Sequence, residues 1–180
     1  MKKSALLIIA LVAFAFTANA QLYKGKRTKI DFFSVTPMEN ITATDTVATM
    51  LLNSATGDVI ANISIKGFVF PSPLMQEHFN ENYMESDKYP YGSFKGKINE
   101  AVNYTVDGVT NVTITGTLTI HGVAQPRTIN ATITVKGGTV TVDSKFAVKL
   151  DDHKIAVPTT MGTKIADSIS VTVHSEMIKA

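Results

Sequence analysis

The four histidines are the residues best suited to metal binding or proton transfer in this sequence. They are His78, His121, His153 and His174, and no two of them have the short spacing of a metal-ligand pair such as H-x-x-x-H. The chain also has no cysteine that could complete such a site. The sequence therefore predicts no metal site. His121 and His174 are expected on the polar, solvated faces of strands.

His78 and two glutamates are the remaining candidates for chemistry. His78 precedes Phe79, and its ring could either contact the head group of a ligand or bond a neighbouring carbonyl. Glu77 and Glu81 lie one helical turn apart, as an acid and base pair could, but a solvated helix face explains them better. No G-x-S-x-G motif orders a serine for attack, and no glycine-rich loop suits a phosphate. We therefore predict no catalytic residue and no cofactor. An enzyme acting on a lipid would have to use His78.

Aromatic and methionine side chains crowd into one part of the chain, residues 68–94. The set is Phe68, Phe70, Met75, Phe79, Tyr83, Tyr89, Tyr91 and Phe94. These side chains could form the core beneath a helix that closes the end of a β-structure. They could instead line an apolar tunnel that holds a ligand.

A short helix is predicted within this aromatic region. Ser72 is suited to cap its N-terminus, and Pro73 to occupy its first position. Met75, Phe79 and Tyr83 follow at intervals of four, which gives the helix one apolar face. Residues 86–90 end it, because a residue that precedes a proline avoids the helical region.

The rest of the chain reads as strands with one apolar face each. Residues 112–120 alternate most clearly, with apolar Val112, Ile114 and Leu118 between threonines. The expected strands cover residues 30–35, 46–53, 59–70, 91–98, 112–120, 129–135, 140–150 and 169–173, with turns at 36–40, 54–58, 107–108, 122–126 and 137–138 and a longer connection at 151–164. Hairpin links and the absence of a β-α-β rhythm indicate an antiparallel sheet, arranged as a sandwich or an up-and-down barrel.

The first 20 residues have the pattern of a secretory signal peptide. Lys2 and Lys3 precede an apolar run of about 12 residues, and Ala18-Asn19-Ala20 fits a cleavage site. Such a run is too short to span a bilayer, so we expect no stable membrane insertion. The predicted product is a periplasmic or secreted protein, cleaved after Ala20, with a single domain over residues 21–180.

Cleavage would also remove the apparent basicity of the chain. Without Lys2 and Lys3, the 17 basic residues become 15, which equals the number of acidic residues. A formally neutral chain without a basic patch does not suit nucleic-acid binding. Because the chain has no cysteine, packing or closure of the sheet must supply its stability.

Two motifs resemble those of the YceI-like family. The first is LMQEHFNENYMES at residues 74–86, followed by Lys88-Tyr89-Pro90 and Phe94-Lys95-Gly96. The second is GTLTIHG at residues 116–122 with Gln125-Pro126, which is similar to the family pattern G-x-L-T-I-x-G-V-x-x-P. The similarity extends over residues 30–177, and the helix resembles a subgroup with the sequence HFNE-x-Y.

This resemblance implies an all-β fold: a single eight-stranded antiparallel lipocalin-like barrel with one short helix closing it. It also implies an exported protein that encloses a polyisoprenoid or a fatty-acid derivative and carries or sequesters it without catalysis. Many relatives carry an Arg-Asp-aromatic-Gly run before the last strands, whereas residues 150–155 here read LDDHKI. That departure removes the basis for a head-group contact from this loop.

The predicted ligand-binding residues come from the helix region and from the inner faces of three strands. They are Phe70, Met75, His78, Phe79, Tyr83, Phe94, Leu118, Ile120 and Phe146. The expected partner is an apolar small molecule, and a second copy of the chain could form a homodimer. The competing hypothesis is a structural or adhesive β domain with a solid core and no ligand.

Overall fold

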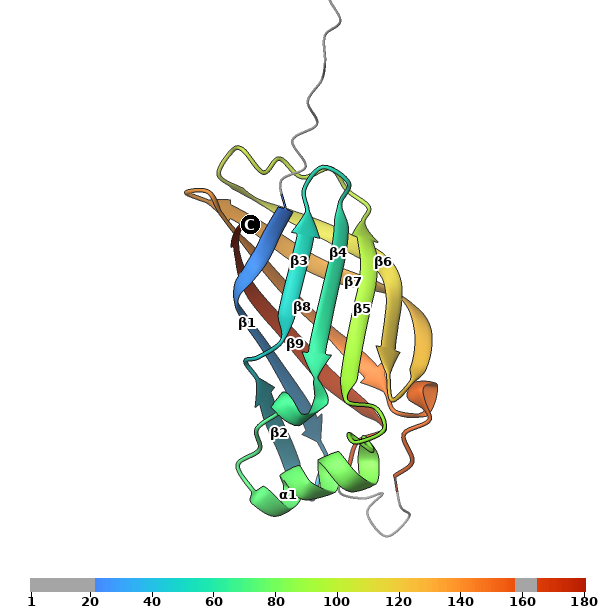
Figure 1. Cartoon of the computed structure of the whole chain (residues 1–180). Coiled ribbons are helices and arrows are strands. Elements are labelled where there is room, and N and C mark those ends of the chain that lie inside the picture. The colour runs from blue at the N-terminus through green and yellow to red at the C-terminus, as the bar shows by residue number, and fades with distance from the viewer. Residues whose placement is uncertain (1–21, 158–164) are drawn as a thin grey trace, which may run out of the picture.

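The computed structural model describes residues 22–157 and 165–180 (Figure 1). The predicted signal peptide and its cleavage site lie outside the described residues. The strands are β1 (Leu22–Val35), β2 (Asn40–Asp45), β3 (Thr49–Asn53), β4 (Asp58–Ser64), β5 (Tyr91–Ile98), β6 (Gly108–Ile120), β7 (Val123–Lys136), β8 (Thr139–Lys149) and β9 (Ser168–Lys179). The helical elements are η1 (Ile65–Gly67), α1 (Pro73–His78), η2 (Phe79–Tyr83) and η3 (Asp151–His153).

The strands form a closed antiparallel barrel. Neighbouring strands pair in chain order from β3 to β9, and β9 pairs with β1 to close the sheet. β2 and β3 act as one interrupted strand, because Ile30↔Asp45 and Leu22↔Asn53 belong to the same register on β1. This confirms the predicted eight-stranded barrel with one short helix.

Several predicted strand boundaries were wrong. β1 begins at Leu22, β2 occupies residues 40–45, which were not expected in a strand, β3 begins only at Thr49, and β4 ends at Ser64. β6 begins earlier than predicted, at Gly108, and β9 extends to Lys179. The break between β2 and β3 is stabilised by Asp45, which is fully buried. Its Oδ1 accepts hydrogen bonds from the backbone N–H groups of Val47 and Ala48, at 2.6 and 3.0 Å.

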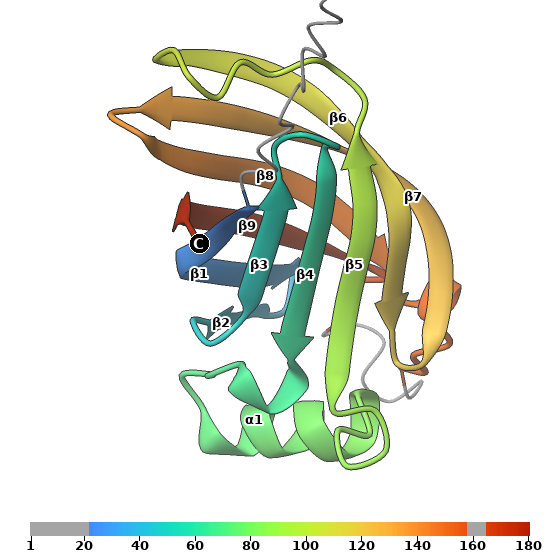
Figure 2. The ribbon, with the colours of Figure 1, turned by 45° about the horizontal axis from the view of Figure 1, so that its top comes forward.

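A pair of glycines allows β5 and β6 to bend. Gly96 and Gly116 lie opposite each other in the ladder. A Cβ on Gly116 would overlap the carbonyl of Lys95 and the Cα of Gly96, so the two backbones can approach only without a side chain. Beyond this point β6 and β7 curl away from β5 (Figure 2).

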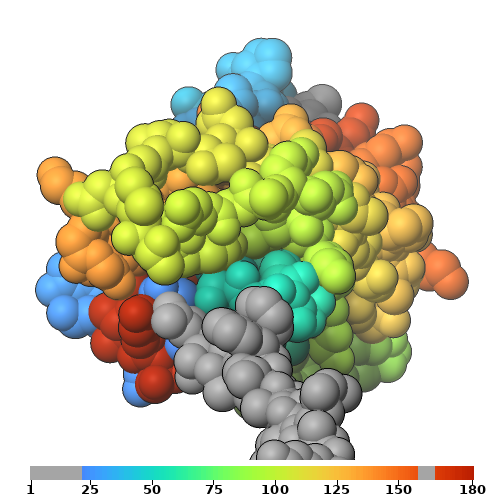
Figure 3. Space-filling view, turned by 90° about the horizontal axis from the view of Figure 1, so that it is seen from above, coloured from blue at the N-terminus to red at the C-terminus, as the bar shows by residue number. Residues whose placement is uncertain are grey.

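The end of the barrel away from α1 is packed with side chains. Its core includes the fully buried Tyr23, Leu52, Ile133 and Met177. Tyr104, from the loop between β5 and β6, lies against Tyr23 with ring centroids 5.9 Å apart. In Figure 3 this loop (yellow-green) lies across that end. Burial raises the pKa of Tyr104 to about 12.

The opposite end is closed by α1 and η2, which are together called the lid below (Figure 1). Ser72 caps the helix as predicted: its Oγ accepts from the N–H of Met75 at 3.5 Å, and Pro73 takes the first position. The helix widens to π geometry from Phe79 to Tyr83. Val69 forms an isolated antiparallel bridge with Thr44 of β2, which fixes the chain that enters the lid.

The barrel wall splits between β7 and β8. Their ladder begins at Lys136↔Thr139 and ends at Ala131↔Ser144, so the lid-side parts of the two strands do not pair. η3 lies at this split, where Gln125 and Arg127 of β7 hydrogen-bond to Asp152 and the ring of His153 hydrogen-bonds to the carbonyl of Val123. The prediction of a turn over residues 122–126 was wrong, because β7 begins at Val123 directly after a two-residue turn. Both turn residues, His121 and Gly122, have positive φ, as the tight mirror-image turns of hairpins require.

Candidate ligand-binding site

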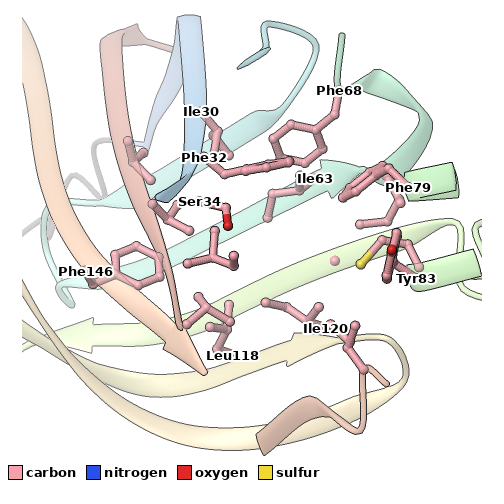
Figure 4. Close-up of a pocket in the computed structure, with 18 of the residues that line it drawn as sticks. Ile30, Phe32, Ser34, Ile63, Phe68, Phe79, Tyr83, Leu118, Ile120 and Phe146 are labelled. Carbon is pink, nitrogen blue, oxygen red and sulfur yellow. The ribbon is translucent and has the colours of Figure 1, made fainter. Parts of the chain in front are cut away.

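A cavity of about 450 Å³ occupies the lid half of the barrel (Figure 4). Its volume lies in the range of small-molecule sites. Side chains from the strands and the lid line it, and most of them are apolar. In Figure 4, Phe79 and Tyr83 enter it from the lid, and Leu118, Ile120 and Phe146 from the strands. The barrel is therefore solid at one end and hollow at the other.

All nine predicted site residues line this cavity. Phe70, Met75, His78, Phe79 and Tyr83 come from the lid and the chain entering it, and Phe94, Leu118, Ile120 and Phe146 from β5, β6 and β8. Their placement follows from the period of two in the strands and the spacing of four in the helix. Their contact with a ligand stays a prediction.

An aromatic cluster attaches the lid to the barrel. Phe32 of β1 lies at the centre, with ring centroids 5.5 Å from Phe68, 5.4 Å from Phe70 and 5.5 Å from Phe79. Phe70 and Phe79 are closer still, at 4.9 Å. The sequence reasoning missed Phe32, although alternation with Ile30 and Ser34 places it on the inner face. Its neighbour Phe33 points outward and is 44% exposed.

The polar side chains that line the cavity fall into two groups. In the first, each hydroxyl already has a partner: Thr28 with Ser175, Ser34 with the N–H of Ala166, Ser72 with the N–H of Met75, and Ser144 with the carbonyl of Asn130. The second group is Glu39, His78, Tyr83 and Ser93. Within residues 22–157 and 165–180 the side chains of this group form no hydrogen bond or ion pair. Burial raises the pKa of Tyr83.

The sequence suggested that His121 lies on a solvated surface. That prediction was wrong, because its side chain is only 11% exposed. Its Nε2 lies 2.7 Å from Oε2 of Glu85, just after the lid, and its Nδ1 lies 3.3 Å from the carbonyl of His153. The ring of Tyr89 contacts it edge-on, with centroids 4.6 Å apart. His121 therefore connects the end of the lid to the β6–β7 turn and to η3. His174, by contrast, is exposed on the outer wall beside Asp143, as predicted.

His153 is completely buried in η3, a position that the sequence did not reveal. Its Nδ1–H donates to the carbonyl of Val123 at 3.0 Å, and its Nε2 has no partner among the described residues. Burial lowers the pKa of His153, and the nearby Arg127 guanidinium adds to this effect. The folded state therefore favours the neutral form of this ring.

The family model described as the YceI-like domain matches residues 23–177. The chain belongs to the YceI-like family. No curated protein sequence gives a significant match. The narrower assignment to a subgroup with the HFNE-x-Y helix stays a prediction.

Solved structures share the fold of this YceI-like domain at low sequence identity. A polyisoprenoid binding domain from Saccharophagus degradans has 13% identity and a TM-score of 0.75, over 88% of this chain and 98% of that one. BcnA from Burkholderia cenocepacia has 18% identity and a TM-score of 0.70, over 83% and 95%. The YCEI protein of Campylobacter jejuni has 19% identity and a TM-score of 0.59, over 97% of both chains.

Two further observations concern the described part of this YceI-like domain. No three histidine, aspartate or glutamate side chains come together there in a way that could hold a metal ion. None of the helices described has the length and apolar character needed to cross a membrane. The site is a mostly apolar cavity, and the polar side chains in its lining without a described partner are Glu39, His78, Tyr83 and Ser93.

Proposed function

We propose that this protein is an exported, non-enzymatic carrier that encloses a long apolar molecule, a polyisoprenoid or a fatty-acid derivative, in the lid half of its barrel. The cavity is the observation that carries this proposal. It combines about 450 Å³ of free volume with a lining that is mostly aliphatic and aromatic. A similar structure is described as a polyisoprenoid binding domain, which supports this class of ligand.

The energetics favour a long chain over a short one. Burial contributes about 0.8 kcal/mol per CH₂. A chain of a dozen carbons therefore gains on the order of 10 kcal/mol, which is comparable with an association cost of about 4–15 kcal/mol. A short ligand would gain too little to bind usefully. The alternative of a domain with a solid core agrees with the end around Tyr23 and Leu52, but not with the hollow end.

The test is the identification of what the purified protein holds. The chain is expressed with its leader, purified without detergent and extracted with organic solvent, and the extract is analysed by mass spectrometry. We expect an apolar molecule at a near-stoichiometric amount. If the extract is empty and the protein also takes up no added prenyl or acyl chain, the proposal fails.

A pair of variants separates binding in the cavity from adhesion to the surface. Ala61 of β4 lines the cavity, whereas its neighbour Ile60 is exposed on the outer wall. Ala61→Phe is expected to fill the cavity and abolish recovery of the molecule. Ile60→Phe adds an aromatic ring on the outside and is expected to leave recovery unchanged. Equal recovery from both variants would place the molecule elsewhere.

Export and assembly are separate parts of the proposal. Fractionation of the expressing cells and N-terminal sequencing of the product would test export and cleavage after Ala20. Whether two copies of the chain form a homodimer is tested by light scattering of the purified mature chain.

A further inference from the structure

The unpartnered polar groups of the cavity gather at its lid end. Along β1, the residues that line the cavity run from Thr28 through Phe32 towards the lid, and Glu39 follows in the turn between β1 and β2. His78 and Tyr83 belong to the lid itself. Ser93, near the lid end of β5, is the fourth member of this group. All four side chains are partly buried, and in the described part of the chain none of them has a hydrogen-bond or ion-pair partner. Farther from the lid, the polar side chains that line the cavity, Thr28 and Ser144, already have hydrogen-bond partners. A bound chain would therefore place its polar end at the lid.

The charge at this end is negative and is not balanced by a described cation. Glu39 supplies a carboxylate, and no lysine or arginine occurs among the described residues that line the cavity. Arg127 of β7 forms an ion pair with Asp152 at 2.7 Å and does not line the cavity. Lys164 lies outside the described residues.

We propose that this cavity selects apolar chains whose polar end is an uncharged or cationic hydrogen-bond donor, such as a primary alcohol, a primary amide or an amine. It rejects chains that end in a carboxylate or a phosphate. This inference rests on the proposed function, because it concerns the head group of the molecule that the cavity holds.

The physical reason is the mismatch between an anionic head group and Glu39. A carboxylate only accepts hydrogen bonds, so it pairs with an N–H or O–H of the ligand and repels a second anion. An anionic head group at the lid would lose water without gaining a cation, and burying an unpaired charge is costly. His78 and Tyr83 can each donate or accept, so they complete the contacts of an alcohol or an amide.

The test is a competition between chains that differ only in their head groups. Hexadecanol, hexadecanamide and hexadecylamine are each mixed with hexadecanoate or hexadecyl phosphate, below the concentrations at which they aggregate. Native mass spectrometry of the mature protein then gives the ratio of the two complexes. We expect the alcohol, amide and amine to bind at least about tenfold more tightly than the two anions, which corresponds to about 1.4 kcal/mol.

Three variants locate the source of this preference. Glu39→Gln removes the charge and keeps the shape of the side chain. It is expected to raise the affinity for hexadecanoate and to reduce, at least severalfold, the preference for the alcohol, amide and amine over the anions. Glu77→Gln removes a charge from the exposed face of the same lid and is expected to leave the ratio unchanged. Lys164→Met is expected to leave it unchanged as well.

The outcomes distinguish the inference from the proposed function. If no chain binds, the carrier function itself fails. If all five bind equally, or the anions bind best, the function stands and the selectivity is refuted. The inference is also overturned if Glu39→Gln does not change the preference, or if Lys164→Met changes it more than Glu39→Gln does. In either case Glu39 would not be the cause of the preference.

Discussion

Arg127 of β7 and Asp152 of η3 face each other across the split in the barrel wall, with Nη2 donating to Oδ2 at 2.7 Å. Gln125 adds a hydrogen bond from Nε2 to the backbone carbonyl of Asp152, also at 2.7 Å. The wall is thus continued here by side-chain contacts and not by a strand ladder. A substitution at Asp152 should therefore affect the whole barrel.

We predict that Asp152→Ala lowers the free energy of unfolding by about 1–2 kcal/mol. The pair is only partly exposed, and the guanidinium of Arg127 already has a buried Nε without a partner among the described residues. Loss of the carboxylate would leave more of it unsatisfied. Urea denaturation monitored by circular dichroism measures the effect. Asp151→Ala, at the exposed neighbouring position, is the control, and equal effects of the two variants would contradict the prediction.

Phe79 is the central lid residue of the aromatic cluster, and we predict that Phe79→Ala destabilises the protein by about 3 kcal/mol. The substitution removes contacts with Phe32, Phe68 and Phe70 and enlarges the cavity. A looser lid should also release a bound chain faster. Urea denaturation and the dissociation rate of a fluorescent acyl probe measure the two effects.

The matched control is Phe33→Ala, which removes a ring from the outer face of β1. It is expected to cost less than about 1 kcal/mol and to leave the dissociation rate unchanged. If Phe79→Ala were no more harmful than this control, the aromatic cluster would not be what attaches the lid.

The features that sequence alone predicted are those set by local periodicity. Alternation in β6 placed Leu118 and Ile120 on the inner face, because each strand buries one face only. Ser72 and Pro73 marked the start of the helix because capping depends on adjacent residues. The eight-stranded closure came from the family resemblance, since alternation alone also allowed a sandwich.

The features that were missed depend on contacts between distant segments. Residues 40–45 form a strand because they pair with β1 and contact Val69, and their own sequence has weak alternation. His121 faces Glu85, which is 36 residues away, so its burial could not be read from its strand. Glu39 was missed as a cavity residue because it lies in a segment that was expected to be a turn on the surface.

The close approach of β5 and β6 leads to a third prediction: Gly116→Ala destabilises the barrel by about 2–3 kcal/mol. The new Cβ would overlap backbone atoms of Lys95 and Gly96, and a backbone cannot move aside as a flexible side chain can. Gly108→Ala is a precise control at the start of the same strand, because nothing lies within 4 Å of a Cβ built there. Thermal and urea denaturation should show a change of at most about 0.5 kcal/mol for this control. If both substitutions lowered the free energy of unfolding by a similar amount, the loss would come from replacing a glycine in a strand and not from the close approach of β5 and β6.

The buried imidazole of His153 makes stability depend on pH near neutrality. Burial holds the pKa of this residue below its ordinary value of 6.5, so the folded protein keeps the ring neutral where the unfolded chain takes up a proton. Proton uptake by the unfolded state favours unfolding. The contribution of the neutral His153 ring to the free energy of unfolding is therefore fully present above about pH 6.5. It decreases as the pH falls towards the pKa of this residue in the folded state. Carboxylates titrate mostly below pH 5, so their effects fall in a lower window.

We predict that the free energy of unfolding decreases between about pH 6.5 and pH 5, with a slope that corresponds to at most one proton for this group. His153→Asn retains a side-chain N–H that can reach the carbonyl of Val123, and it does not titrate. This variant should show a flatter profile over the same range, even if it is less stable throughout. Urea denaturation at closely spaced pH values gives both curves. The two proteins differ in titratable groups only at residue 153. Parallel curves would therefore show that another group causes the pH dependence.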